Sequence, residues 1–482
     1  MIDERSSSWK ILLPNQSKGS ILVCGMDVGV ISGLARTWEH LDWCPSNTML
    51  KSMIDIPVEL AVNMEIVRPS SIQPNRYDIV ILGTDTYGIE AVSVWLKSSG
   101  VLVCVGLPVT NSWRQKIITA GFNRIKLYGV LPFRSPRIIY PLEYRRLRIK
   151  GLGFHRPGSR KANLGLCLLR ILSQFIVIRS LNRGAVLLAS RESKPLDSPM
   201  LSWLNNRFES DFVDLIVYCG SDSARRKITL LAVGKQGASD LIVKVADTEP
   251  GKEAIQQEAY ALQALEQTPV STFTPRLLLS EKWNGYYIQV QSSLGEKKNK
   301  QSNRITNYHL QCLVALSTVN RNICRISDTS TWQNLSKLLD SRNSSLPEVI
   351  FKLAKEVTSM SFSHQEVLTH WVHGDFSPWN MNINKGGLSL WDWEDSQKDG
   401  LAFFDIFHFI IRQAVLVGPW PGGLNLLNLV FSACNNFIKK AKLPEFTDYM
   451  SPLKVWIVHE YITNSSYRLI EVAADLVENE RG

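Results

Sequence analysis

The sequence lacks several features that would place it in a special class of protein. Its eight cysteines are scattered, with no C-x-x-C pair and no metal-ligand spacing, so we expect free thiols in a reducing cytoplasm. No uncharged window reaches the length of a membrane-spanning helix. The first apolar run begins only at Ile11 and is short, so we expect no signal peptide. These absences favour a cytoplasmic protein made of ordinary globular domains.

The length of the chain predicts more than one domain. A chain of 482 residues is too long for a single hydrophobic core, so two domains are expected. The stretch from Ser193 to Ser202 contains Pro195 and Pro199, which is typical of a linker. We therefore predict a first domain at 1–193, a linker at 194–204 and a second domain at 205–482.

The most informative stretch is His373-Gly374-Asp375-Phe376-Ser377-Pro378-Trp379-Asn380. Asp375 can accept a hydroxyl proton, and Asn380 can hold a metal ion. Asp392 follows at the end of a short apolar strand. Phosphoryl transfer needs an oriented acceptor oxygen and neutralised phosphate charge, and these three side chains can supply both.

The residues between Asn380 and Asp392 predict how these two side chains meet. Met381–Ile383 and Leu388–Trp391 are apolar runs joined by Asn-Lys-Gly-Gly, which predicts a β-hairpin. Such a hairpin brings Asp392 back beside Asn380. An Asp and an Asn side by side suit Mg²⁺, which prefers hard oxygen ligands.

Three apolar runs upstream predict an antiparallel meander: Asp214–Gly220, Lys227–Gly234 and Leu241–Ala246. The third run places Lys244 among β-branched residues, where an inward lysine is costly unless it is paired. Glu258 lies in the predicted helix Glu253–Gln267 and is its candidate partner. The alternative is that Lys244 extends along the strand surface to solvent.

These residues resemble the aminoglycoside phosphotransferase and choline kinase families, relatives of the protein kinases. The shared signature H-x-D-x-x-x-x-N, followed by an apolar strand ending in Asp, occurs as His373, Asp375, Asn380 and Asp392. The resemblance implies that Asp375, beside His373 in the catalytic loop, is the base or acceptor-orienting residue. It also implies that Asn380 and Asp392 hold Mg²⁺. Lys244 would contact the ATP phosphates and pair with Glu258.

The resemblance also indicates the remaining nucleotide contacts. The phosphate-covering turn would be Cys219–Arg226, where Ser221 or Ser223 could meet phosphate. This turn has one glycine and no G-x-G-x-x-G, which departs from the protein kinases. The adenine hinge would follow the strand Tyr286–Val290 and include Gln291 and Ser293.

Three ranges downstream of the signature are predicted to be helical. Asp405 fits the start of the helix Ile406–Val415. The resemblance implies that an Asp at this place supports the catalytic loop, so we interpret Asp405 as structural. Leu424–Leu443 and Pro452–Val477 would form the wall of the acceptor site. His459, Glu460 and Tyr461 could face that cleft, although core packing is the alternative for each.

The first domain is predicted to be a Rossmann-like, mostly parallel α/β sheet, because strands and helices alternate along it. We predict strands at 20–24, 77–82, 100–105, 124–130 and 184–189. The fold class is therefore α/β plus α+β, with a two-lobed protein-kinase-like second domain implied by the resemblance.

The first domain resembles class I S-adenosylmethionine-dependent methyltransferases in its strand order and in the turn Gly25-x-Asp27-x-Gly29. The family's G-x-G-x-G carries an Asp in this chain at the middle position. Glu39 and Asp42 are the candidates for an acidic residue that would hold the ribose. We favour a degenerate fold that serves as a scaffold, with S-adenosylmethionine binding as the alternative.

The basic excess is concentrated in an insertion at 131–183 and the residues after it. From Arg134 to Lys194 there are fourteen Lys and Arg against two acids, a net of +12 in a chain of +10. Such a patch predicts an acidic partner. The alternation of charge and apolar runs over 160–179 favours an anionic membrane surface over nucleic acid, because no aromatic-interleaved stretch is present. A solvated basic face is the alternative.

Together these patterns predict an ATP-dependent, Mg²⁺-using phosphotransferase acting on a hydroxyl of a sugar, glycan or aminoglycoside-like molecule. We expect it in the cytoplasm, either free or at the inner membrane face. A bifunctional kinase and methyltransferase in glycan modification is one alternative. A non-catalytic, ligand-binding protein is the other.

Overall fold

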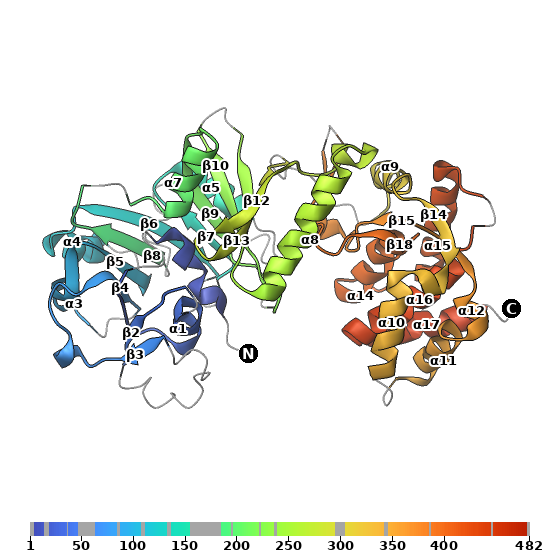
Figure 1. Cartoon of the computed structure of the whole chain (residues 1–482), viewed down its shortest axis with the longest axis horizontal. Helices are drawn as coiled ribbons and strands as arrows, with labels where there is room; N and C mark the ends of the chain where they lie inside the picture. Colours follow the sequence, from blue (N-terminus) through green and yellow to red (C-terminus); the bar gives the residue numbers. More distant parts are fainter. Residues whose placement is uncertain are drawn as a thin grey trace. The chain divides into compact units, whose positions relative to one another are not determined.

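The structure of the chain is a computed structural model (Figure 1). The residues it describes are 4–13, 19–35, 37–46, 63–83, 87–107, 111–132, 136–154, 185–193, 196–220, 223–235, 239–294, 304–341, 346–384, 387–444 and 447–479. The chain forms two compact units, one of residues 1–255 and 278–295 and the other of residues 256–277 and 296–482.

The first unit is built on one thirteen-stranded sheet with the order β12-β13-β11-β10-β9-β7-β6-β8-β5-β4-β1-β2-β3. Its strands are β1 (Ile21–Cys24), β2 (Leu41–Cys44), β3 (Met64–Ile66), β4 (Tyr77–Leu82), β5 (Leu96–Leu107), β6 (Arg124–Leu131), β7 (Ile138–Pro141), β8 (Ala185–Ser190), β9 (Phe212–Tyr218), β10 (Ile228–Gly234), β11 (Leu241–Ala246), β12 (Leu277–Trp283) and β13 (Tyr286–Ser292). Strands β3, β2, β1, β4 and β5 pair in parallel, which confirms the prediction of a mostly parallel N-terminal sheet.

Both faces of this sheet are buried, because apolar residues occupy successive positions along its strands. Ile21 and Val23 of β1 face one core, whereas Leu22 and Cys24 face the other. The helices are η1 (Glu4–Leu12), α1 (Val28–Ala35), η3 (Pro69–Ser71), α3 (Ile89–Trp95), α4 (Asn111–Thr119), α5 (Arg145–Phe154) and α7 (Pro199–Arg207). Helices η1, α1 and α7 cover the first face, and α3, α4 and α5 cover the second (Figure 1).

The boundaries between the compact units do not coincide with the predicted linker at 194–204. Strand β9 pairs with β7, so the sheet continues through both predicted domains. Across the predicted linker, Asp214 accepts a hydrogen bond from Tyr128 Oη at 3.0 Å and forms an ion pair with Lys126 at 3.0 Å. The buried Lys10 likewise pairs with Asp247 at 2.7 Å. A continuous sheet and core therefore join the upstream meander to the N-terminal region.

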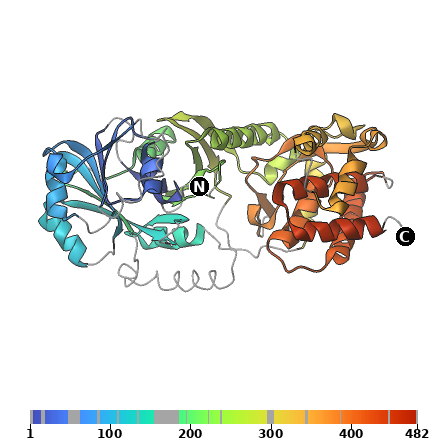
Figure 2. The same ribbon diagram turned by 90° about the horizontal axis from the view of Figure 1, so that it is seen from below.

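The second unit is mainly helical. Helix α8 (Glu249–Leu265) begins in the first unit and ends in the second. The second unit continues with η5 (Pro269–Thr272), α9 (Asn307–Leu316), η6 (Ile326–Asp328), α10 (Ser330–Ser341), α11 (Glu348–Val357), α12 (Met360–Ser363), η7 (Pro378–Asn380), α13 (Phe404–Phe407), η8 (His408–Arg412), α14 (Gln413–Leu416), α15 (Gly423–Ala441), α16 (Met450–Asn464) and α17 (Tyr467–Asn479). Helices α15 and α16 pack on α17 (Figure 2).

Two small sheets complete the second unit. One has the order β14-β15-β18, from β14 (Asn322–Arg325), β15 (Glu366–Val372) and β18 (Gln397–Leu401). The other is the antiparallel hairpin of β16 (Met381–Asn384) and β17 (Gly387–Leu390). This hairpin confirms the one predicted between Asn380 and Asp392.

The predicted C-terminal helices differ from the observed ones in their continuity. The predicted helix at 406–415 contains a π-helical turn, η8. The predicted helix at 452–477 is two helices, because Ser465 adopts a left-handed conformation with φ of 49° and ends α16. Sequence periodicity does not reveal either break, since both flanking segments are apolar and helix-forming.

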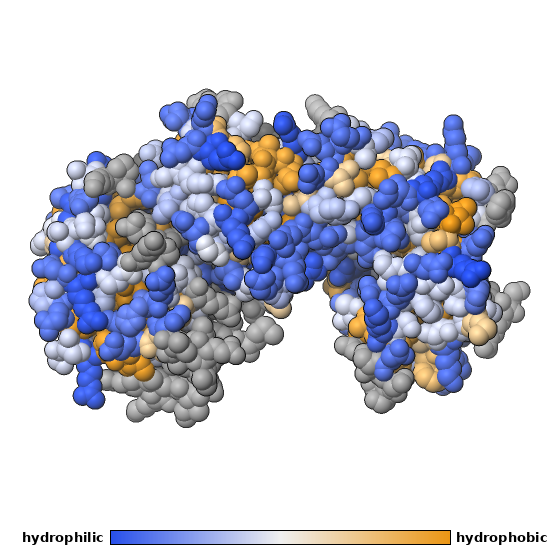
Figure 3. Space-filling model, viewed as in Figure 1, coloured by the Kyte–Doolittle hydropathy of each residue, from blue (hydrophilic) through white to orange (hydrophobic). Residues whose placement is uncertain are grey.

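The structure bears on the predicted membrane contact only in part. In the described segments, no helix has both the length and the apolar character needed to cross a bilayer. On the face drawn in Figure 3, apolar residues form small groups among hydrophilic ones. The predicted membrane-surface stretch at 160–179 lies outside the described residues.

Candidate active site

The loop after β15 carries the predicted signature, and the Asp405 side chain binds its backbone. The buried Asp405 carboxylate accepts the backbone N–H groups of His373 at 2.8 Å and Gly374 at 3.0 Å. Burial raises the pKa of Asp405, although His373 and the two backbone donors oppose this. Gly374 has φ of +83°, and a Cβ there would overlap the carbonyl oxygen of Asp395. Asp405 therefore supports the loop, as predicted.

His373 is fully buried, and both ring nitrogens are engaged. Its Nδ1 accepts the backbone N–H of Asp375 at 3.2 Å, so its Nε2 carries the proton and donates to Trp391 O at 3.2 Å. The ring also packs edge-on against Trp393, with centroids 4.5 Å apart. These are the contacts of a group that positions the loop, and a catalytic role for His373 stays a prediction.

Three side chains surround the carboxylate of Asp375. Ser377 Oγ donates to Oδ1 at 2.5 Å, and Asn380 Nδ2 donates to Oδ2 at 2.8 Å. Arg412 Nη1 lies 3.4 Å from Oδ1. The side chain of Asp375 keeps an exposure of 20%. Its carboxylate is therefore fixed in direction and still open to a ligand.

Asn380 and Asp392 come together as the hairpin requires. The backbone N–H of Trp391 donates to Asn380 O at 3.0 Å, so Asp392 directly follows a residue paired with Asn380. Because Asn380 Nδ2 donates to both the carboxylate and the carbonyl of Asp375, its amide oxygen is the atom left to ligate. Asp392 has φ of 71°, a conformation that Asp tolerates better than most residues. This pair of oxygen donors fits Mg²⁺.

The predicted nucleotide residues are distributed over both units. In the first unit Lys244 is buried in β11, opposite Gln289 and Thr229 in the register of the sheet. Gln291 is buried in β13, Ser293 follows it half-buried, and Ser223 is exposed. Glu258 is fully buried in α8 and belongs to the second unit. Ser221 lies outside the described residues.

Residues 229–420 match the model of the phosphotransferase enzyme family. The chain contains a phosphotransferase-family domain. The match confirms the predicted family and enzyme class, a kinase with an alcohol group as acceptor, for this part of the chain. It includes Lys244, Glu258 and all four signature residues from His373 to Asp392.

Other comparisons place the chain among known structures. No curated protein matches it. The amicoumacin kinase hAmiN, in complex with AMP-PNP, Ca²⁺ and Ami, shares 13% identity over 57% of this chain and 88% of its own, with a TM-score of 0.35. A predicted O-methyltransferase from Agrobacterium tumefaciens shares 14% sequence identity over 43% of this chain and 96% of its own chain, with a TM-score of 0.24. WbdD, bound to the kinase inhibitor LY294002, shares 11% sequence identity over 92% of this chain and 83% of its own chain, with a TM-score of 0.24.

Sequence reasoning missed Arg412, which contacts Asp375 in the candidate site. It lies on the π-helical turn η8 and contacts Asp375, while its Nε is 3.4 Å from Glu460 Oε1. Glu460 is buried and accepts a hydrogen bond from Asn464 at 2.6 Å. The sequence left Glu460 with two alternatives, the acceptor cleft or core packing. A single arginine in an apolar helix carries no sequence signal that would have identified Arg412.

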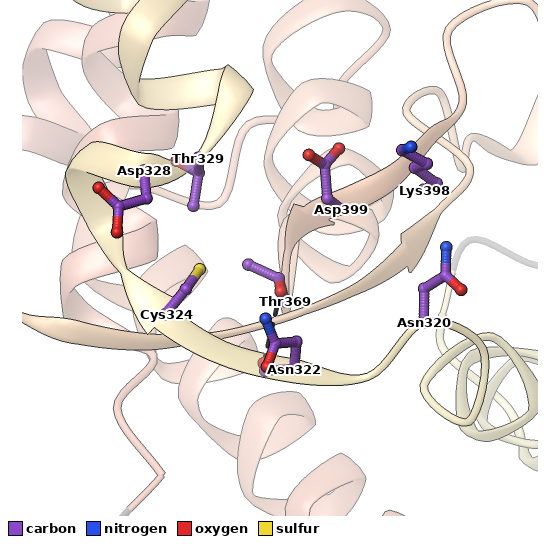
Figure 4. A pocket seen from close by; sticks show the side chains of 8 residues that line it. All are labelled: Asn320, Asn322, Cys324, Asp328, Thr329, Thr369, Lys398 and Asp399. Atoms are coloured by element: carbon purple, nitrogen blue, oxygen red, sulfur yellow. Dashed lines mark hydrogen bonds between the residues drawn. The ribbon is translucent and has the colours of Figure 1, made fainter.

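A polar cavity of about 340 Å³ lies elsewhere in the second unit. It is formed over β14, β15 and β18, and Figure 4 shows Asn322 and Cys324 beside Thr369, with Lys398 and Asp399 across from them. None of the predicted site residues lines this cavity. It is therefore separate from the group around Asp375.

In the N-terminal sheet, the chain's own side chains occupy the position where a cofactor would approach. Strand order reverses between β1 and β4, the place where ligands bind in open α/β sheets. There the buried Met26 packs so closely on Gly83 that a Cβ at Gly83 would overlap its sulfur. Asp27 Oδ1 accepts the N–H of Val30 at 3.0 Å and caps α1. Asp42 is the second residue of β2 and accepts a hydrogen bond from Tyr77 Oη at 2.5 Å, so it does not end that strand.

Proposed function

We propose that this protein is an ATP-dependent phosphotransferase that phosphorylates a hydroxyl group of a sugar, glycan or aminoglycoside-like molecule. The observation that carries the proposal is the arrangement at Asp375, with its partly exposed carboxylate fixed by Ser377 and Asn380. The family match at 229–420 supports it. In this reaction the acceptor oxygen forms a bond to the γ-phosphorus, and the bond from that phosphorus to the β,γ-bridging oxygen breaks to release ADP.

Each of these side chains has its own part in the proposed reaction. Asp375 orients the acceptor hydroxyl and receives its proton as the new bond forms. Asn380 and Asp392 would hold Mg²⁺, which neutralises phosphate charge when it is bound. Lys244 would contact the ATP phosphates, and Glu258 would pair with it. Gln291 and Ser293 would bind at the adenine end of the nucleotide, with Ser221 and Ser223 near the phosphates.

Substitution of Asp375 by Ala tests this function. We expect phosphoryl transfer from ATP to fall by a factor on the order of a thousand or more, with ATP binding retained, because the variant loses only acceptor orientation and proton transfer. ADP release with a panel of sugar, glycan and aminoglycoside acceptors measures the first effect, and calorimetry with ATP the second. Asp399→Ala removes an equally charged, exposed side chain and serves as the control. Unchanged turnover in Asp375→Ala would exclude this site.

The metal ligands give a separate test. We expect Asn380→Ala to raise the Mg²⁺ concentration needed for half-maximal activity, because one of two protein oxygens is lost. Titration of Mg²⁺ at saturating ATP measures it. An unchanged requirement would mean that the ion is held elsewhere.

The alternative is a non-catalytic, ligand-binding protein. The presence of Lys244, Glu258, Asp375, Asn380 and Asp392 argues against it, since loss of any one of them would impair phosphoryl transfer. We also propose that the N-terminal sheet is a scaffold without S-adenosylmethionine, because Met26 and Asp27 occupy its switch point. Saturable binding of labelled S-adenosylmethionine by the full chain would contradict the scaffold.

An acidic partner is proposed for the basic stretch 134–194, with an anionic membrane surface as its form. The charge of the stretch supports this proposal. Co-sedimentation of the full chain with vesicles containing anionic lipid measures it. Absence of binding at low salt would contradict it.

A further inference from the structure

Three side chains near one edge of the N-terminal sheet lie close enough together to share an ion. They are His40, which directly precedes β2, Asp42 of β2 and Glu65 of β3. Asp42 and Glu65 are partners in the parallel register of these neighbouring strands (Figure 1), and His40 is two residues before Asp42. Register partners, and side chains two apart along a strand, point to the same face of a sheet. The three side chains therefore share one face.

The distances within this group match those between the ligands of a small divalent cation. His40 Nε2 lies 2.9 Å from Asp42 Oδ1 and 3.8 Å from Glu65 Oε2. The three ligand atoms all lie within 4.8 Å of one another. Zinc bonds of about 2.0–2.2 Å place the atoms of a tetrahedral site roughly 3.4 Å apart. Within the segments that the structure describes, no other three side chains of these types come this close together.

The buried carboxylate of Asp42 supplies the observation that points to an ion. Its side chain is only 1% exposed. Its Oδ2 accepts a hydrogen bond from Tyr77 Oη at 2.5 Å and pairs with Arg76 at 2.9 Å. Its Oδ1 accepts no hydrogen bond from the described residues, although His40 Nε2 is close to it. A buried carboxylate oxygen without a donor is costly, and a bound cation satisfies it.

The residue types restrict which ion fits. Neutral imidazole is a good ligand for Zn²⁺ and Co²⁺, whereas Mg²⁺ and Ca²⁺ take oxygen ligands. One nitrogen and two carboxylate oxygens leave the fourth position of a tetrahedral Zn²⁺ to water. The carboxylates of Asp42 and Glu65 outweigh the one guanidinium of Arg76, so the charge also favours a cation. Tyr77 orients the Asp42 carboxylate, as the outer partners of metal ligands usually do.

The group lies away from the place where a cofactor would approach the sheet. His40 directly precedes β2, and Arg76 directly precedes β4, so both lie at the amino ends of parallel strands. Met26 and Asp27 follow the carboxyl end of β1. An ion at His40 would therefore lie toward the opposite end of the strands from the switch point. There it would connect β3, the last strand in the order of the sheet, to β2.

We propose that His40, Asp42 and Glu65 form a zinc site that fastens β3 to the N-terminal sheet. Each side chain supplies one ligand atom, and water completes the coordination. Asp42, which the sequence offered as a candidate for ribose binding, has this role instead. The site is independent of the proposed phosphotransferase reaction, whose Mg²⁺ ligands Asn380 and Asp392 belong to the other unit.

The test uses the full chain, stripped of metal by a chelator and then supplied with excess Mg²⁺ to occupy the oxygen ligands of the second unit. Co²⁺ is the spectroscopic probe, because tetrahedral Co²⁺ absorbs visible light far more strongly than the hydrated ion. Competition with a chromophoric chelator measures the affinity for Zn²⁺. We expect one equivalent of Co²⁺ to give the tetrahedral absorption and Zn²⁺ to abolish it. Zn²⁺ should also raise the unfolding temperature of the first unit and slow amide exchange at 64–67.

His40 and Glu65 suit substitution, because their side chains are 58% and 61% exposed and their removal leaves the core intact. We expect His40→Gln and Glu65→Gln each to weaken Zn²⁺ binding about 100-fold or more, and Tyr77→Phe to weaken it about 10-fold. His364→Gln, which removes an exposed histidine of the second unit, should bind Zn²⁺ like the wild type. Asn380→Ala shows whether the ion binds at the phosphotransferase site.

Binding of one equivalent of Zn²⁺ that both ligand variants weaken, and that Asn380→Ala leaves intact, supports the site. Absence of tetrahedral Co²⁺ absorption in the wild-type protein overturns it, and so does binding that only Asn380→Ala abolishes. Equal losses in His40→Gln and His364→Gln would mean unspecific coordination by exposed histidines, which also overturns it. Zn²⁺ binding without slower amide exchange at 64–67 would overturn the fastening of β3.

Discussion

The support of the catalytic loop by Asp405 gives the sharpest stability prediction. Asp405→Ala removes the acceptor of two backbone N–H groups, those of His373 and Gly374. Each hydrogen bond to a charged group contributes about 1.5–3 kcal/mol, so the two together contribute roughly 3–6 kcal/mol. Burial raises the pKa of Asp405, so removal of the carboxylate recovers part of its desolvation cost. We expect the second unit to lose about 3 kcal/mol of stability.

Amide hydrogen exchange is the most direct assay for this effect. In Asp405→Ala the amides of His373 and Gly374 should exchange faster, because they lose their acceptor, and urea should unfold the second unit at lower concentration. Phosphoryl transfer should fall through kcat, since the loop that carries Asp375 shifts. Asp399→Ala, which removes an exposed acid from β18, is the matched control. Wild-type exchange at 373–374 together with wild-type stability in Asp405→Ala would refute the reasoning.

Two further predictions concern a backbone conformation and pH. Gly374→Ala should destabilise the protein by about 2–5 kcal/mol, because it adds left-handed strain and an overlap with Asp395. Gly285 has a similar φ but open space around it, so Gly285→Ala should show the strain alone. Equal effects of the two substitutions on the free energy of unfolding would contradict the overlap. Burial lowers the pKa of three histidines from 6.5 to about 4, namely His309, His370 and His408. Because the unfolded chain binds these protons below pH 6.5 and the folded one only near 4, stability is complete above pH 6.5 and falls as pH drops towards 4. Thermal unfolding between pH 7.5 and 4 measures this loss of stability. His370→Gln should reduce the loss, and substitution of the exposed His364 by Gln should not. Identical pH profiles of the two variants would contradict the role of the buried histidine.

The signature residues were predictable because their chemistry depends on local spacing. A loop places Asn380 against Asp375, and a short hairpin places Asp392 directly after the residue that pairs with Asn380. The turn residues at 384–387 specify that hairpin. The predicted support by Asp405 followed from the resemblance, since the sequence pattern alone indicated only a helix start. The parallel strands of the N-terminal sheet were predictable because alternation of strands and helices is a local pattern.

Contacts between distant segments were not predictable. The pairing of β7 with β9, which joins the meander to the N-terminal sheet, links residues about eighty positions apart, and no turn or spacing signals it. The burial of His373, which leaves it to position the loop, depends on packing against Trp393. The filling of the switch point by Met26 depends on its approach to Gly83.

The sequence by itself determined the hairpin and the order of the polar residues on which the proposed chemistry rests, because phosphoryl transfer needs particular side chains at short, fixed spacings. Only the tertiary structure decided what surrounds Asp375. Arg412 reaches Asp375 from η8, and Glu460 of α16 lies 3.4 Å from Arg412. Neither residue stands out in its apolar segment of the sequence. Such contacts depend on distances in space between segments far apart in the chain, which the order of residues does not contain.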